Sequence, residues 1–501
     1  MNDTIVIGGQ SEMDGQIDGQ MKIDSRISGE CGIFFPVTPP PAPVEELVIK
    51  DVMFMDYDGS VVASYDAADF IANVTSLPTP PSHDGLTFQE WNWTLADIKT
   101  ELQTGSGACC IGANYTTTDG KTHIFIDLQP IEGSKRVQFY IYRTSGTQVV
   151  DWGDGTTNSY SGNTYARHLY ADWGKYEITI DGGVWGFSTT AEGVRSIPED
   201  DADIGGQSAI HSNTFLKEIR VGTGCKIPNT YSNIFRNCPN FEAISVHNAF
   251  ISEAGQMNLS SLFYASGIKF FAFPKGSGAS TSTQNSAMNN CFTGCPRLIT
   301  VSFPKGFRYL QTAFSASGVK FVYFPYIATM DAHNTYVNFQ YCENLKRVAM
   351  AFDSFTTTYA NGFYATFQYA YGIQQISLDK MKFGNLNRYT CYTCYNLRGE
   401  ITIPSSVTVL TGENFYNCYS VTKFTFLGAL TSIGVQAFYS CNSCMEWDFT
   451  HCTSVPALAN TNAFTNIRPT AVIKVPAALE ASWKATANWS NSSIVGHIVG
   501  V

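Results

Sequence analysis

Apolar residues recur at a regular spacing through the second half of the chain, and this spacing predicts its fold. The pattern is Phe-x-x-Cys/Ser-x-x-Leu-x-x-Ile-x-Val/Ile/Phe, and about ten copies lie between Phe235 and Val475, with a period of 22 to 29 residues. Such a period is typical of a solenoid, in which each repeat buries its apolar side only against its neighbours. We therefore expect a stack of coils with a long repetitive surface. The positions expected to form its core ladder are Phe235, Cys238, Phe292, Cys295, Leu298, Phe339, Cys342, Leu345, Phe415, Cys418, Phe438 and Cys441.

Residues 13–35 alternate between polar side chains and apolar or small ones. This is the period of a β-strand with one face to bury. Residues 36–43 follow as a stiff proline-rich spacer. Because an isolated ribbon has nothing local to pack on, we expect an arm that pairs with other copies of the chain, a trimer being favoured, or docks on a scaffold protein. A flexible tail is the alternative.

A small module is predicted over residues 46–127. Residues 52–62 have the pattern of a hairpin with a tight Asp-Gly turn. Residues 66–74 and 94–103 predict two short helices, the second capped by the Thr94 side chain. The adjacent pair Cys109-Cys110 has no role that the pattern explains.

This module resembles the internalin-B-type extracellular repeat, and the resemblance implies a β-grasp-like fold. The matching residues are Asp58-Gly59, Pro78, Pro81 and Gly85-x-x-Phe88-x-x-Trp91. The sequence after Trp91 departs from the short internalin-B-type repeat. It is similar to a longer form of this repeat found in prophage-type proteins with leucine-rich repeats.

The next segment resembles a polycystic-kidney-disease (PKD) domain, which implies an immunoglobulin-like β-sandwich. The matching residues are Trp152-Gly153-Asp154-Gly155-Thr156, His168-x-Tyr170 and Gly174-x-Tyr176. Trp152 and Tyr176 are expected to fill the core of this sandwich, and His168 is expected to be structural.

The repeats themselves resemble the BspA-type leucine-rich repeat, Phe-x-x-Cys-x-x-Leu-x-x-Ile-x-Ile/Leu-Pro. The whole chain is therefore expected to be mainly β and modular, with an N-terminal β arm, a small α+β domain, a β-sandwich and a C-terminal solenoid. The expected parts are the arm (1–35), a Pro-rich linker (36–45), the β-grasp-like module (46–127), the PKD-like sandwich (128–190), the solenoid (191–475) with an N-terminal cap near 194–211, and a C-terminal cap (476–501).

Composition narrows the function. The net charge is −11 and only 15% of the 501 residues are charged, so the concentrated basic face that nucleic-acid binding needs is absent. No run approaches the ~20 apolar residues that span a bilayer. Six of the 14 cysteines share one repeat position, where Ser and Ala also occur. Packing of reduced thiols therefore explains them better than disulfides or metal sites, and this includes the pairs Cys391-x-x-Cys394 and Cys441-x-x-Cys444.

Few residues suggest catalysis or cofactor binding. The eight histidines are scattered, without the spacing of metal or nucleophile motifs. The pairs Asp56/Asp58 and Asp151/Asp154 each end in Asp-Gly, which turn formation explains, although calcium at the second pair stays open. We expect no enzyme activity, no cofactor and no metal.

Tyrosines are the most informative side chains in the repeats. Tyr392, Tyr416 and Tyr439 follow the anchor position of three consecutive repeats, while Tyr395 and Tyr419 follow the cysteine position. Equivalent positions align in a stack, so these residues should form ladders. Either the ladders fill the seam between repeats or simply coat the surface, or they offer aromatic faces to a sugar or protein partner.

These modules are typical of surfaces outside cells, whereas the N-terminus lacks a secretory pattern and the C-terminus lacks a wall-sorting motif. We therefore expect a bacteriophage virion protein, a fibre or decoration protein, whose arm binds other virion proteins and whose repeats bind a host cell-surface glycan or protein. The alternatives are a secreted or surface bacterial adhesin, a purely structural decoration protein and a carbohydrate-active enzyme.

Overall fold

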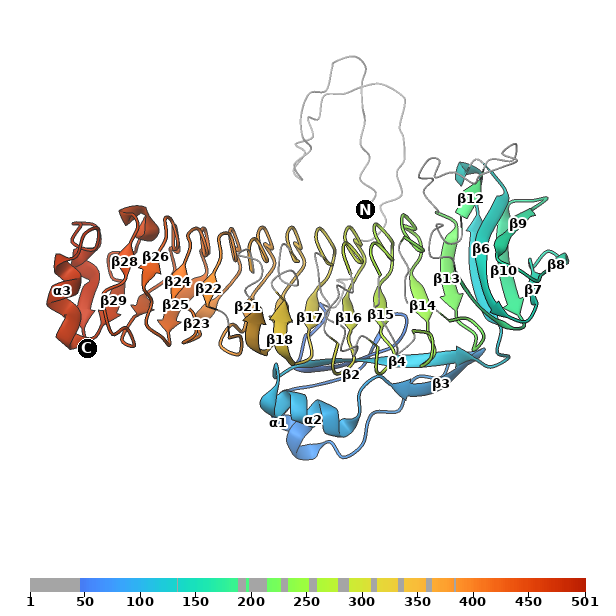
Figure 1. The fold of residues 1–501 in the computed structure, drawn as a ribbon, viewed down its shortest axis with the longest axis horizontal. Coiled ribbons are helices and arrows are strands. Elements are labelled where there is room, and N and C mark those ends of the chain that lie inside the picture. Colours follow the sequence, from blue (N-terminus) through green and yellow to red (C-terminus); the bar gives the residue numbers. More distant parts are fainter. Residues whose placement is uncertain are drawn as a thin grey trace, which may run out of the picture. The chain divides into compact units, whose positions relative to one another are not determined.

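The computed structural model describes residues 46–132, 134–187, 195–197, 214–226, 233–251, 259–277, 288–307, 313–331, 338–356, 363–382 and 384–501. The predicted arm and the whole of the predicted linker lie outside this part of the chain. Residues 49–501 form one compact unit, shown in Figure 1. It is mainly β, with short helices and a C-terminal β-solenoid.

The first module is a four-stranded mixed sheet with two helices. Its strands run in the order β2-β1-β4-β3, with β1 antiparallel to β2 and parallel to β4. The predicted hairpin and both predicted helices are confirmed, and the Thr94 hydroxyl accepts the Asp97 backbone N–H at 3.1 Å. The elements are β1 (Val52–Met55), β2 (Val61–Tyr65), α1 (Ala67–Asn73), β3 (Leu86–Trp91), α2 (Leu95–Thr104) and β4 (Cys109–Thr117).

Strand β4 is buried along its whole length, which explains the two adjacent cysteines. Successive side chains of a strand point to opposite faces. Cys109 and Ile111 therefore join the core of the module. Cys110 and Gly112 face the solenoid, where the Cys110 carbonyl accepts a hydrogen bond from the Ser302 hydroxyl.

The second module consists of two packed antiparallel sheets. Its strands are β5 (Thr122–Leu128), β6 (Arg136–Ser145), β7 (Gln148–Asp151), β8 (Thr157–Tyr160), β9 (Thr164–Leu169), β10 (Gly174–Asp181), β11 (Val184–Phe187) and β12 (Arg195–Ile197), with a short 3-10 turn at Pro130–Glu132. The sandwich thus begins at Thr122, inside the range expected for the preceding module. Trp152 is fully buried as predicted, but its partner in the core is Tyr170, whose hydroxyl donates to the Trp152 carbonyl at 2.8 Å. Tyr176 is only partly buried and stacks on Tyr170.

The sandwich also closes the N-terminal end of the solenoid. One sheet runs β14-β13-β5-β10-β7-β8, so the first two strands of the repeats, β13 (Leu216–Arg220) and β14 (Ala243–Ser245), extend it. The antiparallel pairing of β5 with β13 occupies the edge that the solenoid would otherwise expose. The predicted cap near 194–211 lies almost wholly outside the described residues, and in the described part this end is covered by the sandwich.

The repeats form coils whose short strands pair in parallel (Figure 1). One row of strands comprises β15 (Phe270–Ala272), β16 (Thr300–Ser302), β17 (Phe321–Tyr323), β19 (Arg347–Ala349), β21 (Gln375–Ile376), β23 (Gly399–Ile403), β25 (Val421–Phe426), β27 (Glu446–Asp448) and β29 (Val472–Val475). A second row comprises β18 (Ile327–Asp331), β20 (Phe352–Thr356), β22 (Asn385–Leu386), β24 (Val409–Leu410), β26 (Ser432–Ile433) and β28 (Ala457–Leu458).

Each coil makes its turn with a left-handed residue two positions after the anchor. Most side chains disfavour this conformation, yet it recurs in coil after coil. The residues are Asn237, Ala265, Gly294, Ala316, Tyr341, Tyr369, Thr393, Asn417, Ser440 and Asn466, with φ between 53° and 69°. The sequence pattern did not predict this feature, because the position accepts many residue types.

All twelve positions of the expected core ladder are buried. Phe rings of neighbouring coils stack, as Phe339 and Phe367 do with centroids 5.4 Å apart. The cysteines, expected only as small apolar side chains, also act as donors. Five of the thiols donate to a backbone carbonyl of the preceding coil: Cys295 to Phe263, Cys342 to Phe314, Cys394 to Phe367, Cys418 to Cys391 and Cys441 to Phe415, at 2.9 to 3.2 Å. Ser266 and Ser317 stand at the same position, and their hydroxyls contact the Sγ atoms of Cys295 and Cys342 in the next coil at 3.7 Å.

The C-terminal cap is built as expected from residues after β29. Strand β30 (Ile498–Gly500) pairs in parallel with β29, and helix α3 (Glu480–Ala485) packs beside it. Trp483 and Trp489 are both fully buried against the last coils. Short 3-10 turns lie at Thr461–Phe464, Ala477–Leu479 and Val495–His497.

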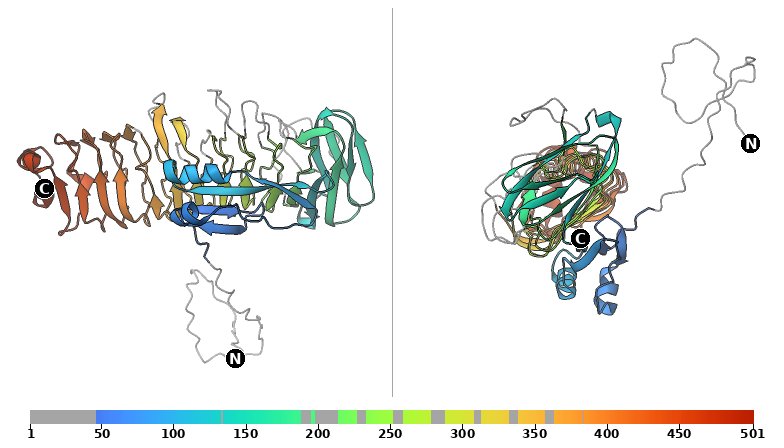
Figure 2. Two further views of the ribbon diagram at one scale, coloured as in Figure 1. Left: turned by 90° about the horizontal axis from the view of Figure 1, so that it is seen from below. Right: turned by 90° about the vertical axis from the view of Figure 1, so that its right-hand side faces the viewer.

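The first module lies on the outer face of the first coils (Figure 2). Strand β4 contacts β14 to β17. The Asn92 side chain donates to the Phe273 carbonyl and the Ser302 hydroxyl, both at 2.9 Å, and the Trp93 indole donates to the Phe303 carbonyl at 2.7 Å. A Cβ at Gly112 would lie 2.4 Å from that of Ala272. We call β15, β16 and β17 the covered strands, and β23, β25, β27 and β29 the free strands.

Candidate functional site

The five predicted tyrosines come together in two stacks. Tyr392, Tyr416 and Tyr439 form one stack, with ring centroids 4.7 and 4.6 Å apart and planes within 11° of parallel. Tyr395 and Tyr419 form the other, with centroids 5.1 Å apart and planes 5° from parallel. These spacings match the ~4.8 Å separation of paired strands. The coil repeat therefore sets the ring spacing.

Further tyrosines that the sequence analysis did not single out join these stacks. Tyr371 stacks on Tyr395 at 5.2 Å, and Tyr341 stacks on Tyr369 at 5.0 Å. Tyr369 contacts Tyr392 edge-on at 5.6 Å. Tyr371 could have been found from the sequence, because it follows Ala370, which stands at the cysteine position. We define the tyrosine surface as Tyr341, Tyr369, Tyr371, Tyr389, Tyr392, Tyr395, Tyr416, Tyr419 and Tyr439.

The stacking changes what this surface can offer a ligand. Rings that stack face to face cover each other's faces. The aromatic faces that the sequence analysis expected to be open to a partner are therefore mostly covered by neighbouring rings. Tyr341, Tyr395 and Tyr419 are 47%, 37% and 38% exposed, and the other members are partly buried. Within the described residues, the hydroxyls of Tyr371, Tyr392, Tyr395, Tyr416, Tyr419 and Tyr439 form no hydrogen bond. Ring edges and hydroxyls are therefore the groups available to a ligand.

The electrostatics keep the phenols neutral. Partial burial, followed by the proximity of other tyrosines, raises the pKa of Tyr371, Tyr416 and Tyr419 above the ordinary value, and partial burial likewise raises that of Tyr392. Each of these hydroxyls thus remains able to donate and to accept at neutral pH. At the edge of the surface, Arg388 forms an ion pair with Glu413 and lies over the Tyr389 ring.

The predicted acidic pairs shape turns. Asp58 accepts the backbone N–H of Ser60, and Asp154 accepts that of Thr156. The second oxygen of Asp154 bonds to His168, whose ring stacks on Trp152. In the described part of the chain no group of three or more His, Cys, Asp or Glu residues could hold a metal ion.

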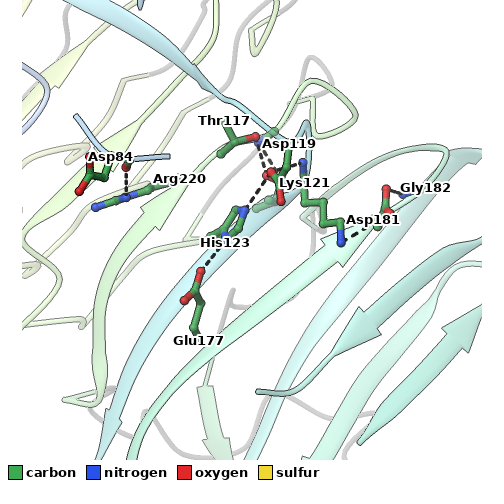
Figure 3. A network of polar contacts seen from close by, with 11 residues as sticks. Asp84, Thr117, Asp119, Lys121, His123, Glu177, Asp181, Gly182 and Arg220 are labelled. Atoms are coloured by element: carbon green, nitrogen blue, oxygen red, sulfur yellow. Dashed lines mark hydrogen bonds and ion pairs between the residues drawn. The ribbon is translucent and has the colours of Figure 1, made fainter. Parts of the chain in front are cut away.

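A network of polar contacts lies where the first module, the sandwich and the first coil meet (Figure 3). The two ring nitrogens of His123 lie 2.6 Å from Glu177 and 3.1 Å from Asp119. Nearby, Arg220 donates to the Asp84 carbonyl at 2.8 Å. Both ring nitrogens of His123 are thus engaged by carboxylates. The network joins the modules.

Thirteen cysteines in the described chain are free and buried. Burial raises the pKa of the Cys295 and Cys342 thiols to about 12, so these thiols remain protonated. Cys391, Cys394, Cys441 and Cys444 lie in the core of the coils. No helix in the described residues has the length and apolar character of a membrane span.

Comparison with known proteins identifies the repeats. The BspA type Leucine rich repeat region matches in six copies over residues 260–346, 313–445 and 364–481. Residues 260–481 therefore carry BspA-type leucine-rich repeats. The match covers the tyrosine surface and the free strands. The resemblances of the two preceding modules lie outside it and stay predictions.

Two solved structures show similarity to this chain. A leucine-rich repeat protein from Bacteroides ovatus ATCC 8483 is 18% identical, with a TM-score of 0.25, over 62% of this chain and 90% of its own. The TLR13–ssRNA13 complex is 10% identical, with a TM-score of 0.23, over 51% of this chain and 41% of that one. The search of curated proteins found no match.

Proposed function

We propose that this leucine-rich repeat protein is a binding protein, without catalytic activity, whose BspA-type repeats attach to a glycan or protein on a cell surface through the tyrosine surface. The observation that carries this proposal is the pair of tyrosine stacks with free hydroxyls on consecutive coils. Tyrosine loses little conformational entropy on binding, and its hydroxyl both donates and accepts, which suits a binding surface. The stacks could instead serve only the packing of the coils, and unbonded hydroxyls argue against that role.

We propose further that the protein is part of a bacteriophage virion, as a tail or head fibre or decoration protein. The resemblance of its modules to prophage-type repeat proteins supports this setting, as does the strand-like pattern of residues 13–35. In this setting the arm would bind other virion proteins or build a trimer. A secreted or surface bacterial adhesin is the alternative, and the same surface would serve it.

Binding of the labelled full chain to a panel of bacterial cells tests the proposal. The double variant Tyr395→Ala/Tyr419→Ala should lose at least about 30-fold in affinity, since truncating central tyrosines of an interface costs more than ~1 kcal/mol each. Tyr142→Ala is the matched control, because Tyr142 lies on the sandwich and is 37% exposed, as Tyr395 is. Binding of the double variant at the level of the unaltered chain would refute the role of the surface. A chain that binds no cell would favour a purely structural decoration protein.

A further inference from the structure

We propose that the ligand of the tyrosine surface is a neutral, linear glycan that runs along the stack of coils. This inference rests on the proposed function and names the chemical class of its ligand. Three properties of the surface carry it: its regular spacing, its charge and the way its rings are turned.

The regular spacing favours a polymer. Three successive rings recur at 4.7 and 4.6 Å in one stack, and Tyr371, Tyr395 and Tyr419 recur at 5.2 and 5.1 Å in the other. Each ring carries a hydroxyl that no described residue engages. A partner that satisfies several of them at once must present polar groups repeatedly along one direction, which a chain of sugar units does.

The charge of the surface favours a neutral polymer. Its members are uncharged phenols, and two arginines of the same coils have partners of their own. Arg388 pairs with Glu413, and Arg398 donates to the side chain of Gln374. A polyanion would need a row of available Lys or Arg side chains. The whole chain carries a net charge of −11, which repels polyanions further.

The way the rings are turned favours sugar over protein. Protein interfaces place aromatic anchors in desolvated pockets, whereas here the rings cover one another and leave edges and hydroxyls. A phenol hydroxyl both donates and accepts, and each sugar hydroxyl does the same. A phenol hydroxyl and a sugar hydroxyl can therefore form a hydrogen bond with either one as the donor. The glycan can bind at several positions along the surface.

Titration calorimetry of the full chain with soluble linear glucans and mannans, and with heparin and alginate as anionic controls, tests the proposal. We expect binding to a neutral polysaccharide that tightens with its chain length until the ligand spans the surface. Tyr395→Phe/Tyr419→Phe should weaken it about 30-fold, equivalent to about 1 kcal/mol per hydroxyl. These substitutions keep the ring stack, so the melting temperature should not change. Tyr142→Phe should bind as the unaltered chain does.

Binding to none of the neutral polysaccharides, or equal binding by the double Phe variant, would overturn the proposal. Preference for heparin or alginate would overturn it as well. These outcomes are separable from failure of the proposed function. If cells bind the chain through the tyrosines but lose that binding after protease treatment, the partner is a protein and only the glycan is ruled out.

Discussion

The covered and the free strands belong to the same stack of coils, yet their outward side chains differ in burial and charge. The covered strands turn Phe270, Ala272, Phe321 and Tyr323 outward, and all four are buried beneath the first module. The free strands present Glu400, Lys423, Glu446 and Lys474 on their outer face, joined by ion pairs of 2.7 to 3.4 Å. The inward side chains stay apolar in both regions. The outward side chains of a repeat thus depend on whether another module covers them. The inward side chains depend only on the packing of the coils.

This difference also indicates where the energy of each region lies. Exposed ion pairs such as those of Lys423 contribute little, about 0 to 1 kcal/mol each. Burial of aromatic side chains contributes about 2 kcal/mol or more for each one. We therefore expect the covered region to depend on its contact with the first module, and the free region to tolerate changes on its outer face.

Gly112→Val should have the largest effect on stability. A Cβ there would lie 2.4 Å from that of Ala272, so β4 would have to lift from the covered strands. Overpacking of this kind costs about 3 kcal/mol, which should lower the first thermal transition and expose the covered strands to protease. Gly162→Val is the control, because its Cβ would meet nothing within 4 Å. Equal melting curves for the two variants would show that the module does not rest on the coils as described.

Loss of a ladder thiol should have an intermediate effect that is the same in both regions. Cys295→Ala near the covered strands and Cys418→Ala near the free strands each remove a buried thiol that donates to a backbone carbonyl of the preceding coil. We expect about 2 kcal/mol for each in chemical denaturation, and a smaller cost for the Ser variants, which keep a donor. A large cost in one region alone would contradict a core ladder common to both.

Lys305→Met should have the smallest effect on stability, and the loss of stability should disappear at low pH. Partial burial alone would raise the pKa of Asp97, but the hydrogen bonds of Lys305 and Thr94 lower it overall. A carboxylate with a lowered pKa contributes stability above its unfolded pKa, near ~3.9, and loses it as the pH falls through its folded pKa. The variant should therefore be about 0.5 kcal/mol less stable at pH 7 and equal to the unaltered chain below that pKa. A difference that persists in acid would show that Lys305 acts through packing.

Local patterns were sufficient to predict much of the fold. The hairpin at β1–β2, the helix capped by Thr94, the buried anchors of the coils and the closing cap with Trp483 all follow from periodicity and turn chemistry within short windows. The contact of the first module with the coils could not be predicted, because it joins residues such as Asn92 and Ser302 that lie 210 positions apart. Strand β4 is buried along its whole length because of this contact. In the sequence, the only sign of that burial was the unexplained pair Cys109-Cys110.

The sequence predicted where the tyrosine stacks lie, but not how their rings are oriented. Spacing alone aligned Tyr392, Tyr416 and Tyr439, since equivalent positions of a stack must superpose. It could not show that the rings lie face to face, because ring orientation depends on rotamers and neighbours. The repeat spacing also did not predict the edge-on contact of Tyr369 with Tyr392. Tyr369 has a left-handed backbone conformation, which the spacing does not reveal.

Oxidative footprinting of the full chain, free and bound to a cell surface that it recognises, would test most directly whether the repeats bind through the tyrosine surface. We expect Tyr395 and Tyr419 to become protected on binding, with Tyr142 unchanged and Met445, near the free strands and 39% exposed, still oxidised. Protection of the sandwich or the free strands, with Tyr395 and Tyr419 as reactive as before, would contradict this assignment and place the binding surface elsewhere.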